Sequence, residues 1–192
     1  MHIGLLFGSF NPVHIGHLII AHTMIELVNL DKVWLVVTPK SPFKFSEELL
    51  DAQERLTMVQ MAIADNPKME LCDIEFSMPK PHYTINTLKK LQQMYPDITF
   101  SLIIGEDNLV NFDKWEGYKD ILTNFEVYVY PRPYTQDAKL KGHPKVHFLN
   151  CPLLDISASY IREFIRAGNS IRYLVPPQVD EYIRLKLISK FK

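Results

Sequence analysis

The sequence predicts one doubly wound α/β domain over residues 1–192, with a mainly parallel sheet and a helical segment at the C-terminus. Short runs rich in β-branched and aromatic residues alternate with longer amphipathic stretches along the whole chain. Several of the short runs are apolar almost throughout, as in strands that are covered on both faces. No repeat, low-complexity tract or linker interrupts this alternation, which therefore indicates a single domain.

The expected elements follow from these patterns in chain order. Strands are expected at 2–7, 32–38, 69–76, 99–104, 126–130 and 145–149. Helices are expected at 16–29, 51–65, 84–95, 157–167 and 177–189, the fourth of them closed by a left-handed cap at Gly168-Asn169. Because open α/β sheets bind ligands beyond the carboxyl ends of their strands, the segments after residues 7, 38, 104 and 130 are predicted to form the site.

Composition excludes several classes of protein. The 192 residues are 47% hydrophobic, and 21 Lys and Arg face 22 Asp and Glu, which gives a net charge of −1. This balance argues against a disordered tail and against a chain held to nucleic acid by its overall charge. No apolar run approaches the roughly 18 residues of a membrane span, and no secretion signal is evident, so a cytoplasmic protein is expected. Cys72 and Cys151 are too far apart to suggest a disulfide framework or a zinc site, and both are expected to be buried, reduced thiols.

A histidine-containing turn follows the first expected strand and leads into an apolar helix. Gly8 leaves room for a ligand beside the backbone, and a helix N-terminus attracts phosphate. His14 and His17 are placed to donate to a phosphate oxygen there. On spacing alone a metal pair or two surface histidines are equally good interpretations, although Glu26 is more than two turns away and no third ligand is close in sequence. His22 is expected to be an ordinary helix residue.

A second motif lies near the C-terminus, at residues 156–162 with the sequence ISASYIR. Ser157 is a suitable N-cap for the helix that follows, and Ser159 and Arg162 are available to phosphate oxygens. Taken alone, Arg162 could equally pair with a surface carboxylate.

The two motifs together resemble the signature of the nucleotidylyltransferase superfamily, G-x-F-x-P-x-H-x-G-H followed by ISSTxIR. The resemblance implies a Rossmann-like fold in which the paired histidines bind and polarise a nucleotide triphosphate. Other segments are similar to those of the bacterial nicotinate mononucleotide adenylyltransferases, namely 81–88, 103–109 with Trp115, 130–133 and 173–183. The chain departs from that pattern at five positions. Phe7 stands where relatives carry Gly, and Asn11 where they carry Asp. Ala158 and Ser159 replace Ser and Thr, and Phe43 stands where relatives often carry His.

The resemblance also implies roles for individual residues. The residues implied to bind ATP are Gly8, Ser9, Phe10, His14, His17, Gly105, Asp107, Ile156, Ser157, Ser159 and Arg162, with His14, His17 and Arg162 as the catalytic set. The residues implied to bind the mononucleotide are Ser9, Lys44, Thr84, Asp107, Trp115 and Arg132. From the residues alone, Trp115 could be a core anchor and Asp107 a helix cap, while Lys44 and Arg132 could be ordinary loop cations.

The implied reaction transfers the adenylyl group of ATP to nicotinate mononucleotide and gives nicotinate adenine dinucleotide and pyrophosphate. It implies in-line attack without a covalent intermediate, with Mg²⁺ accompanying ATP and no protein metal site. Small-molecule substrates are the expected partners, with no nucleic acid and no membrane. The alternatives are another transferase of the superfamily, acting on phosphopantetheine or a cytidine nucleotide, and a nucleotide-binding regulator without turnover.

Overall fold

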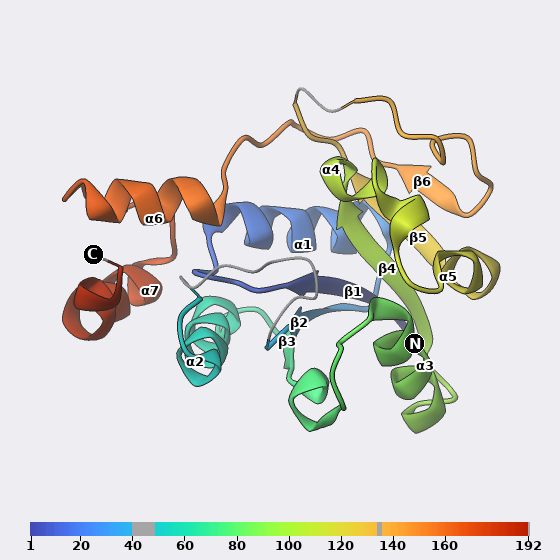
Figure 1. The fold of residues 1–192 in the computed structure, drawn as a ribbon, viewed down its shortest axis with the longest axis horizontal. Coiled ribbons are helices and arrows are strands. Elements are labelled where there is room, and N and C mark those ends of the chain that lie inside the picture. The colour runs from blue at the N-terminus through green and yellow to red at the C-terminus, as the bar shows by residue number, and fades with distance from the viewer. Residues whose placement is uncertain (40–48, 134–135, 192) are drawn as a thin grey trace.

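The computed structural model describes residues 1–39, 49–133 and 136–191, which form a six-stranded sheet covered by helices (Figure 1). The strand order is β3-β2-β1-β4-β5-β6, and every neighbouring pair is parallel. The expected doubly wound α/β class is therefore confirmed. Within the described ranges no helix is long and apolar enough to cross a membrane.

The strands lie close to the predicted ranges. They are β1 (His2–Gly8), β2 (Lys32–Val37), β3 (Met69–Cys72), β4 (Thr99–Gly105), β5 (Glu126–Tyr130) and β6 (Val146–Phe148). Strand β1 is central, with Leu5 opposite Trp34 of β2 on one side and Leu102 of β4 on the other. Because the side chains of a strand alternate between two covered faces, both faces of the central strands must be apolar.

Helices cover both faces of the sheet. They are α1 (Ile15–Val28), α2 (Ala52–Ile63), α3 (Thr84–Met94), α4 (Glu106–Leu109), α5 (Tyr118–Asn124), α6 (Ala158–Arg166) and α7 (Pro177–Tyr182). One core cluster joins α1, α2, α6 and α7 to sheet residues such as Leu35, and the other joins α3 and α5 to residues such as Leu5. The first turns of α1, α3 and α4 all lie at the carboxyl edge of the sheet, because each of them follows the end of a strand or the segment after it.

One predicted strand and the predicted burial of one cysteine are corrected. The strand expected at 69–76 ends at Cys72, and Ile74–Ser77 forms the short 3₁₀ helix η1. This turn buries the Glu75 carboxylate, whose Oε1 accepts a hydrogen bond of 2.8 Å from the Thr87 hydroxyl on α3. Cys151 is only partly buried, contrary to prediction, because it lies in the segment that connects β6 with α6.

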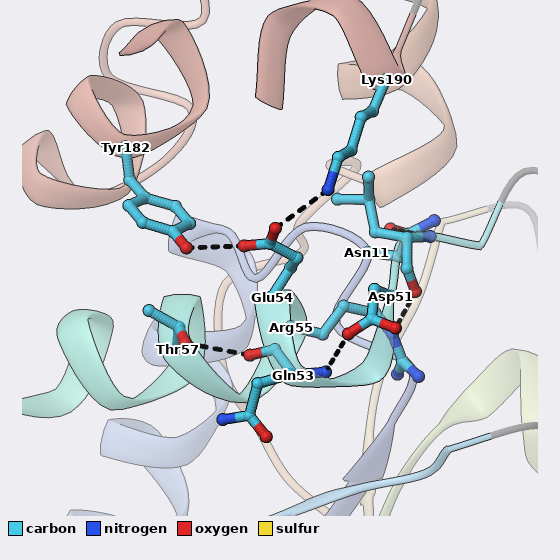
Figure 2. Close-up of polar contacts among 9 residues, drawn as sticks. Asn11, Asp51, Gln53, Glu54, Arg55, Thr57, Tyr182 and Lys190 are labelled. Atoms are coloured by element: carbon cyan, nitrogen blue, oxygen red, sulfur yellow. Dashed lines mark hydrogen bonds and ion pairs between the residues drawn. The ribbon is translucent and has the colours of Figure 1, made fainter. Parts of the chain in front are cut away.

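The C-terminal helix expected at 177–189 is not one α-helix. After α7 the chain continues as a π-helical turn, η3 (Ile183–Leu187), and a 3₁₀ turn, η4 (Ile188–Lys190). A row of buried residues runs along this segment at a spacing of four, namely Val179, Ile183, Leu187 and Phe191. This spacing is wider than the roughly 3.6-residue period of an α-helix, so a wider turn keeps the row facing the core. Figure 2 shows how the segment docks on α2, where Glu54 accepts hydrogen bonds from Tyr182 (2.6 Å) and Lys190 (2.9 Å).

Candidate active site

Two adjoining cavities lie at the carboxyl edge of the sheet. The histidine cavity, about 580 Å³, is lined by His14 and His17, and the α3 cavity, about 500 Å³, is lined by Tyr83 and Thr84. Both linings include the same residues at their junction, namely Phe7, Gly8, Ser9, Asp107, Asn108 and Trp115. A ligand with two parts could therefore occupy both cavities at once.

The two histidines form one stacked unit at the start of α1. His14 is the N-cap and His17 lies three residues on, with ring centroids 3.7 Å apart. The backbone N–H of His14 donates to Nδ1 of His17 over 3.2 Å. Only an unprotonated ring nitrogen can accept this bond, so neutral His17 carries its proton on Nε2.

His14 is held neutral by its surroundings. Its side chain is only 2% exposed, and burial together with the positive charge of Arg132 lowers the pKa of His14 from 6.5 to about 3. Burial excludes the interpretation of His14 as a surface histidine. The metal-pair interpretation also loses support, because the rings are stacked and the described part of the chain has no group of three His, Cys, Asp or Glu side chains placed to hold a metal ion.

The C-terminal motif reaches the same cavity. Ser157 caps α6 as predicted, accepting the Tyr160 N–H over 3.2 Å. Arg162 donates Nη1–H to the Asn11 carbonyl over 3.0 Å and Nη2–H to the Ser159 hydroxyl over 3.3 Å. The Arg162 guanidinium is thus fixed against the loop that leads to His14.

Gly16 brings the two helix starts together. A Cβ at Gly16 would overlap Cγ2 of Ile156, the residue just before the α6 cap. The missing side chain therefore makes room for the C-terminal motif and also for the His14 ring, whose Nδ1 would lie 2.9 Å from such a Cβ.

The predicted ATP-binding residues gather in the histidine cavity, with one exception. Ile156 does not line this cavity but lies beside Gly16. The residues that line it are Gly8, Ser9, Phe10, His14, His17, Gly105, Asp107, Ser157, Ser159 and Arg162. His22 is exposed on α1, as expected for an ordinary helix residue.

The α3 cavity holds four of the residues predicted to bind the mononucleotide, Ser9, Thr84, Asp107 and Trp115. Trp115 is half-buried, with its ring centroid 5.0 Å from that of Phe112, so it packs on the core and also faces both cavities. Thr84 is the first residue of α3, where backbone N–H groups have no partner within the helix. This end of the cavity therefore suits an anionic group.

Arg132 lies apart from the other described residues predicted to bind the mononucleotide, whereas Asp107, predicted to bind both substrates, lines both cavities. Arg132 lines the histidine cavity and not the α3 cavity, and its Nη1–H donates to the Leu154 carbonyl over 2.9 Å. Its Nε lies 3.9 Å from Asp107 Oδ1. The interpretation of Asp107 as a helix cap is wrong, because Gly105 is the N-cap of α4. Lys44, also predicted to bind the mononucleotide, is outside the described residues.

Comparison with known proteins identifies the family. The sequence pattern of the cytidylyltransferase-like family matches residues 5–164. A relative from Cytophaga hutchinsonii, named probable nicotinate-nucleotide adenylyltransferase, is 51% identical over 95% of both chains, and one of the same name from Flavobacterium johnsoniae is 49% identical over 95% of this chain and 96% of its own. The chain belongs to the nicotinate-nucleotide adenylyltransferase family.

The fold of a solved member of this family is also similar. The nicotinic acid mononucleotide adenylyltransferase of Plasmodium falciparum, solved as a complex with NaAD, superimposes with a TM-score of 0.81 over 98% of this chain and 97% of its own. At 22% sequence identity this likeness shows that the Rossmann-like fold is shared.

Three polar residues near the nicotinate-nucleotide adenylyltransferase site were not predicted from the sequence. Glu75 and His82 line the α3 cavity although both side chains are buried. Burial raises the pKa of Glu75 and lowers that of His82. Arg55 is wholly buried beneath the loops of the site. Glu75 and Arg55 stand outside the recognised motifs, whereas His82 lies in the segment 81–88, where no role was predicted for it. The folded chain brings all three residues to this edge of the sheet.

Proposed function

We propose that this chain transfers the adenylyl group of ATP to nicotinate mononucleotide, with nicotinate adenine dinucleotide and pyrophosphate as products. One observation carries the proposal: His14, His17, Ser159 and Arg162, from motifs about 150 residues apart, line one cavity that joins a second cavity beside α3. Membership of the nicotinate-nucleotide adenylyltransferase family supports the same reaction. The cytoplasm is the proposed location, as expected from the sequence.

The reaction needs alignment more than proton transfer. The mononucleotide phosphate is already anionic at neutral pH, so it can attack the α-phosphorus of ATP directly as pyrophosphate leaves, with no covalent intermediate. The protein must then stabilise the charge on the oxygens of the transferred and leaving phosphates. His17, through its Nε2–H, and Arg162 would supply these hydrogen bonds, and neutral His14 would add one without competing for a proton.

The α3 cavity would hold the pyridine nucleotide. The half-buried Trp115 ring offers a stacking surface for the flat pyridine ring. The N-terminus of α3 at Thr84 would receive the carboxylate on that ring, since backbone N–H groups there point outward and the helix dipole favours an anion. Asp107 lines both cavities, where it would accept hydrogen bonds from ribose hydroxyl groups.

Magnesium would enter as MgATP. Asp107 is the one acidic residue among the described residues that line the histidine cavity, whereas the other charged and titratable groups there are donors. Such a lining suits a metal ion that is held mostly by phosphate oxygens and water. When bound, Mg²⁺ would neutralise part of the triphosphate charge.

The test measures product formation directly. Purified protein is mixed with MgATP and, separately, nicotinate mononucleotide, nicotinamide mononucleotide or phosphopantetheine, and pyrophosphate release is followed. The proposal expects release with nicotinate mononucleotide at the highest kcat/KM. Release only with phosphopantetheine would make the chain a different adenylyltransferase, and ATP binding without release in any mixture would make it a regulator.

A further inference from the structure

Arg55 is a fully buried arginine on the first turn of α2, with 0% of its surface exposed. Its guanidinium donates to four backbone carbonyls. They belong to Ser9 (2.6 Å), Thr38 (2.8 Å), Pro39 (2.7 Å) and Leu50 (3.1 Å). Since each acceptor is a carbonyl, the charge is balanced by backbone dipoles.

The Arg55 side chain stays protonated in this setting. Burial lowers the pKa of Arg55 to about 10, with the Asp51 carboxylate opposing that effect. A pKa of about 10 leaves the guanidinium charged at neutral pH. Charged donors form stronger hydrogen bonds than neutral donors, so the four carbonyls are held firmly.

The carbonyls that Arg55 binds come from the segments that build the site. Ser9 follows β1 and lines both cavities, Thr38 follows β2 and lines the α3 cavity, and Leu50 precedes α2. Arg55 itself lines neither cavity. It can therefore affect a ligand only through the loops that it ties together.

The contact with Ser9 sets the direction of one peptide unit. In a trans peptide the N–H points away from the C=O, so a Ser9 carbonyl turned toward Arg55 directs the Phe10 N–H away from Arg55. Phe10 lines the histidine cavity and adopts φ 47°, a left-handed conformation that is uncommon for an aromatic residue. Its ring is buried, 3.0 Å from where a Cβ of Gly8 would lie, and meets the His17 ring edge-on.

The same loop is held at its other end by the C-terminal motif. The Asn11 carbonyl accepts the Arg162 hydrogen bond, and Asn11 Oδ1 accepts the Leu50 N–H over 3.3 Å. Figure 2 shows Asn11 beside the start of α2, where Asp51 and Arg55 lie. Residues 9–11 therefore lie between the buried guanidinium of Arg55 and that of Arg162, which lines the histidine cavity.

We propose that Arg55 is a positioning residue for adenylyl transfer, which turns the Ser9–Phe10 peptide so that the Phe10 N–H donates to a phosphate group of ATP. This inference rests on the proposed function and adds to it a residue that touches no substrate. Lysine at this position would keep the charge, but it could not reach four carbonyls with the fixed fork of a guanidinium.

The test compares ligands with and without phosphate. Arg55→Lys is titrated calorimetrically with ATP and with adenosine, alongside Arg166→Lys as a control, because Arg166 also donates to a backbone carbonyl, that of Phe191, away from both cavities. We expect Arg55→Lys to weaken ATP binding about tenfold and to lower kcat by a similar factor, with adenosine affinity unchanged within twofold. Arg166→Lys should change none of these. Equal loss of ATP and adenosine affinity would overturn the proposal, because a merely structural role gives that result.

A second measurement uses the wild-type protein, so its outcome does not depend on whether a variant folds. Inorganic pyrophosphate is added to ¹⁵N-labelled wild-type protein, and the Phe10 amide resonance is followed. The proposal expects a large shift of that resonance on saturation, and an unchanged resonance with pyrophosphate bound would overturn it. Wild-type protein that forms no dinucleotide would instead count against the proposed function, so the two failures are distinct.

Discussion

His17 is the residue whose loss should affect turnover most directly, because its tautomer is fixed by the backbone N–H of His14. We predict that His17→Ala lowers kcat for dinucleotide formation by on the order of 10²–10³, the usual scale for losing one donor to transition-state charge. His22→Ala is the matched control, since it removes an exposed histidine from the same helix. Near-normal turnover in a folded His17→Ala protein would remove His17 from the mechanism.

His14 should make the protein less stable in mild acid. Its pKa is about 3 in the folded state and about 6.5 when the chain is unfolded, so between these values the unfolded state binds more protons. The free energy of unfolding should therefore fall as the pH falls below 6.5, by up to about 1.4 kcal/mol per pH unit from this one group.

Chemical denaturation at pH 7 and pH 5 measures this effect. Compared with wild type, His14→Gln should lose less stability between the two pH values, because glutamine does not titrate. An identical pH dependence in both proteins would show that His14 titrates normally in the folded state.

At the scale of elements, the contact between the starts of α1 and α6 aligns the two halves of the histidine cavity. Gly16→Ala should push Ile156 away and weaken ATP binding, because Ser157, Ser159 and Arg162 follow Ile156 directly. Adding Ile156→Ala removes the overlapping methyl group, but the new Cβ would still lie 2.9 Å from Nδ1 of His14. The double variant should therefore recover part of the lost affinity.

Gly142→Ala is the control for this pair, since nothing lies within 4 Å of a Cβ at that position. The ATP affinities of wild type, Gly16→Ala, Ile156→Ala and the double variant form a double-mutant cycle. Additive effects of Gly16→Ala and Ile156→Ala would show that the two helix starts are not coupled.

The elements differ in how far the sequence could predict them. Strands such as 126–130 and the cap at Gly168, with φ 77°, follow from local residue preferences, and the structure has them where expected. The 3₁₀ turn at Ile74–Ser77 depends on the bond between Glu75 and Thr87, and helix α5 was not predicted at all. Local pattern cannot show a contact made between separate parts of the chain.

The residues of the site also differ in how far the sequence could predict them. Some site residues lie in motifs whose side chains suit phosphate binding, so they could be identified before the fold was known. They are His14, His17, Ser157 and Arg162. Arg55 resembles any other arginine of an amphipathic helix in sequence, and its burial beneath three segments is a property of the folded chain. Arg132 was assigned to the mononucleotide, yet it lines the histidine cavity, where its guanidinium donates to the Leu154 carbonyl in the segment before α6.

At the scale of the whole molecule, strand order brings the two ends of the sequence to one place. Strand β1 is central, so the loop after it lies between the segments that follow β2 and β4, and the crossover after β6 carries α6 back over that loop. Figure 1 shows α6, from the last quarter of the chain, near the start of α1. The proposed reaction depends on this convergence.

A crystal structure with a non-hydrolysable ATP analogue bound tests that convergence most directly. It should place a single triphosphate in contact with His14 and His17 on one side and with Ser159 and Arg162 on the other, with the α-phosphorus facing the α3 cavity. A triphosphate bound away from either motif would contradict the account.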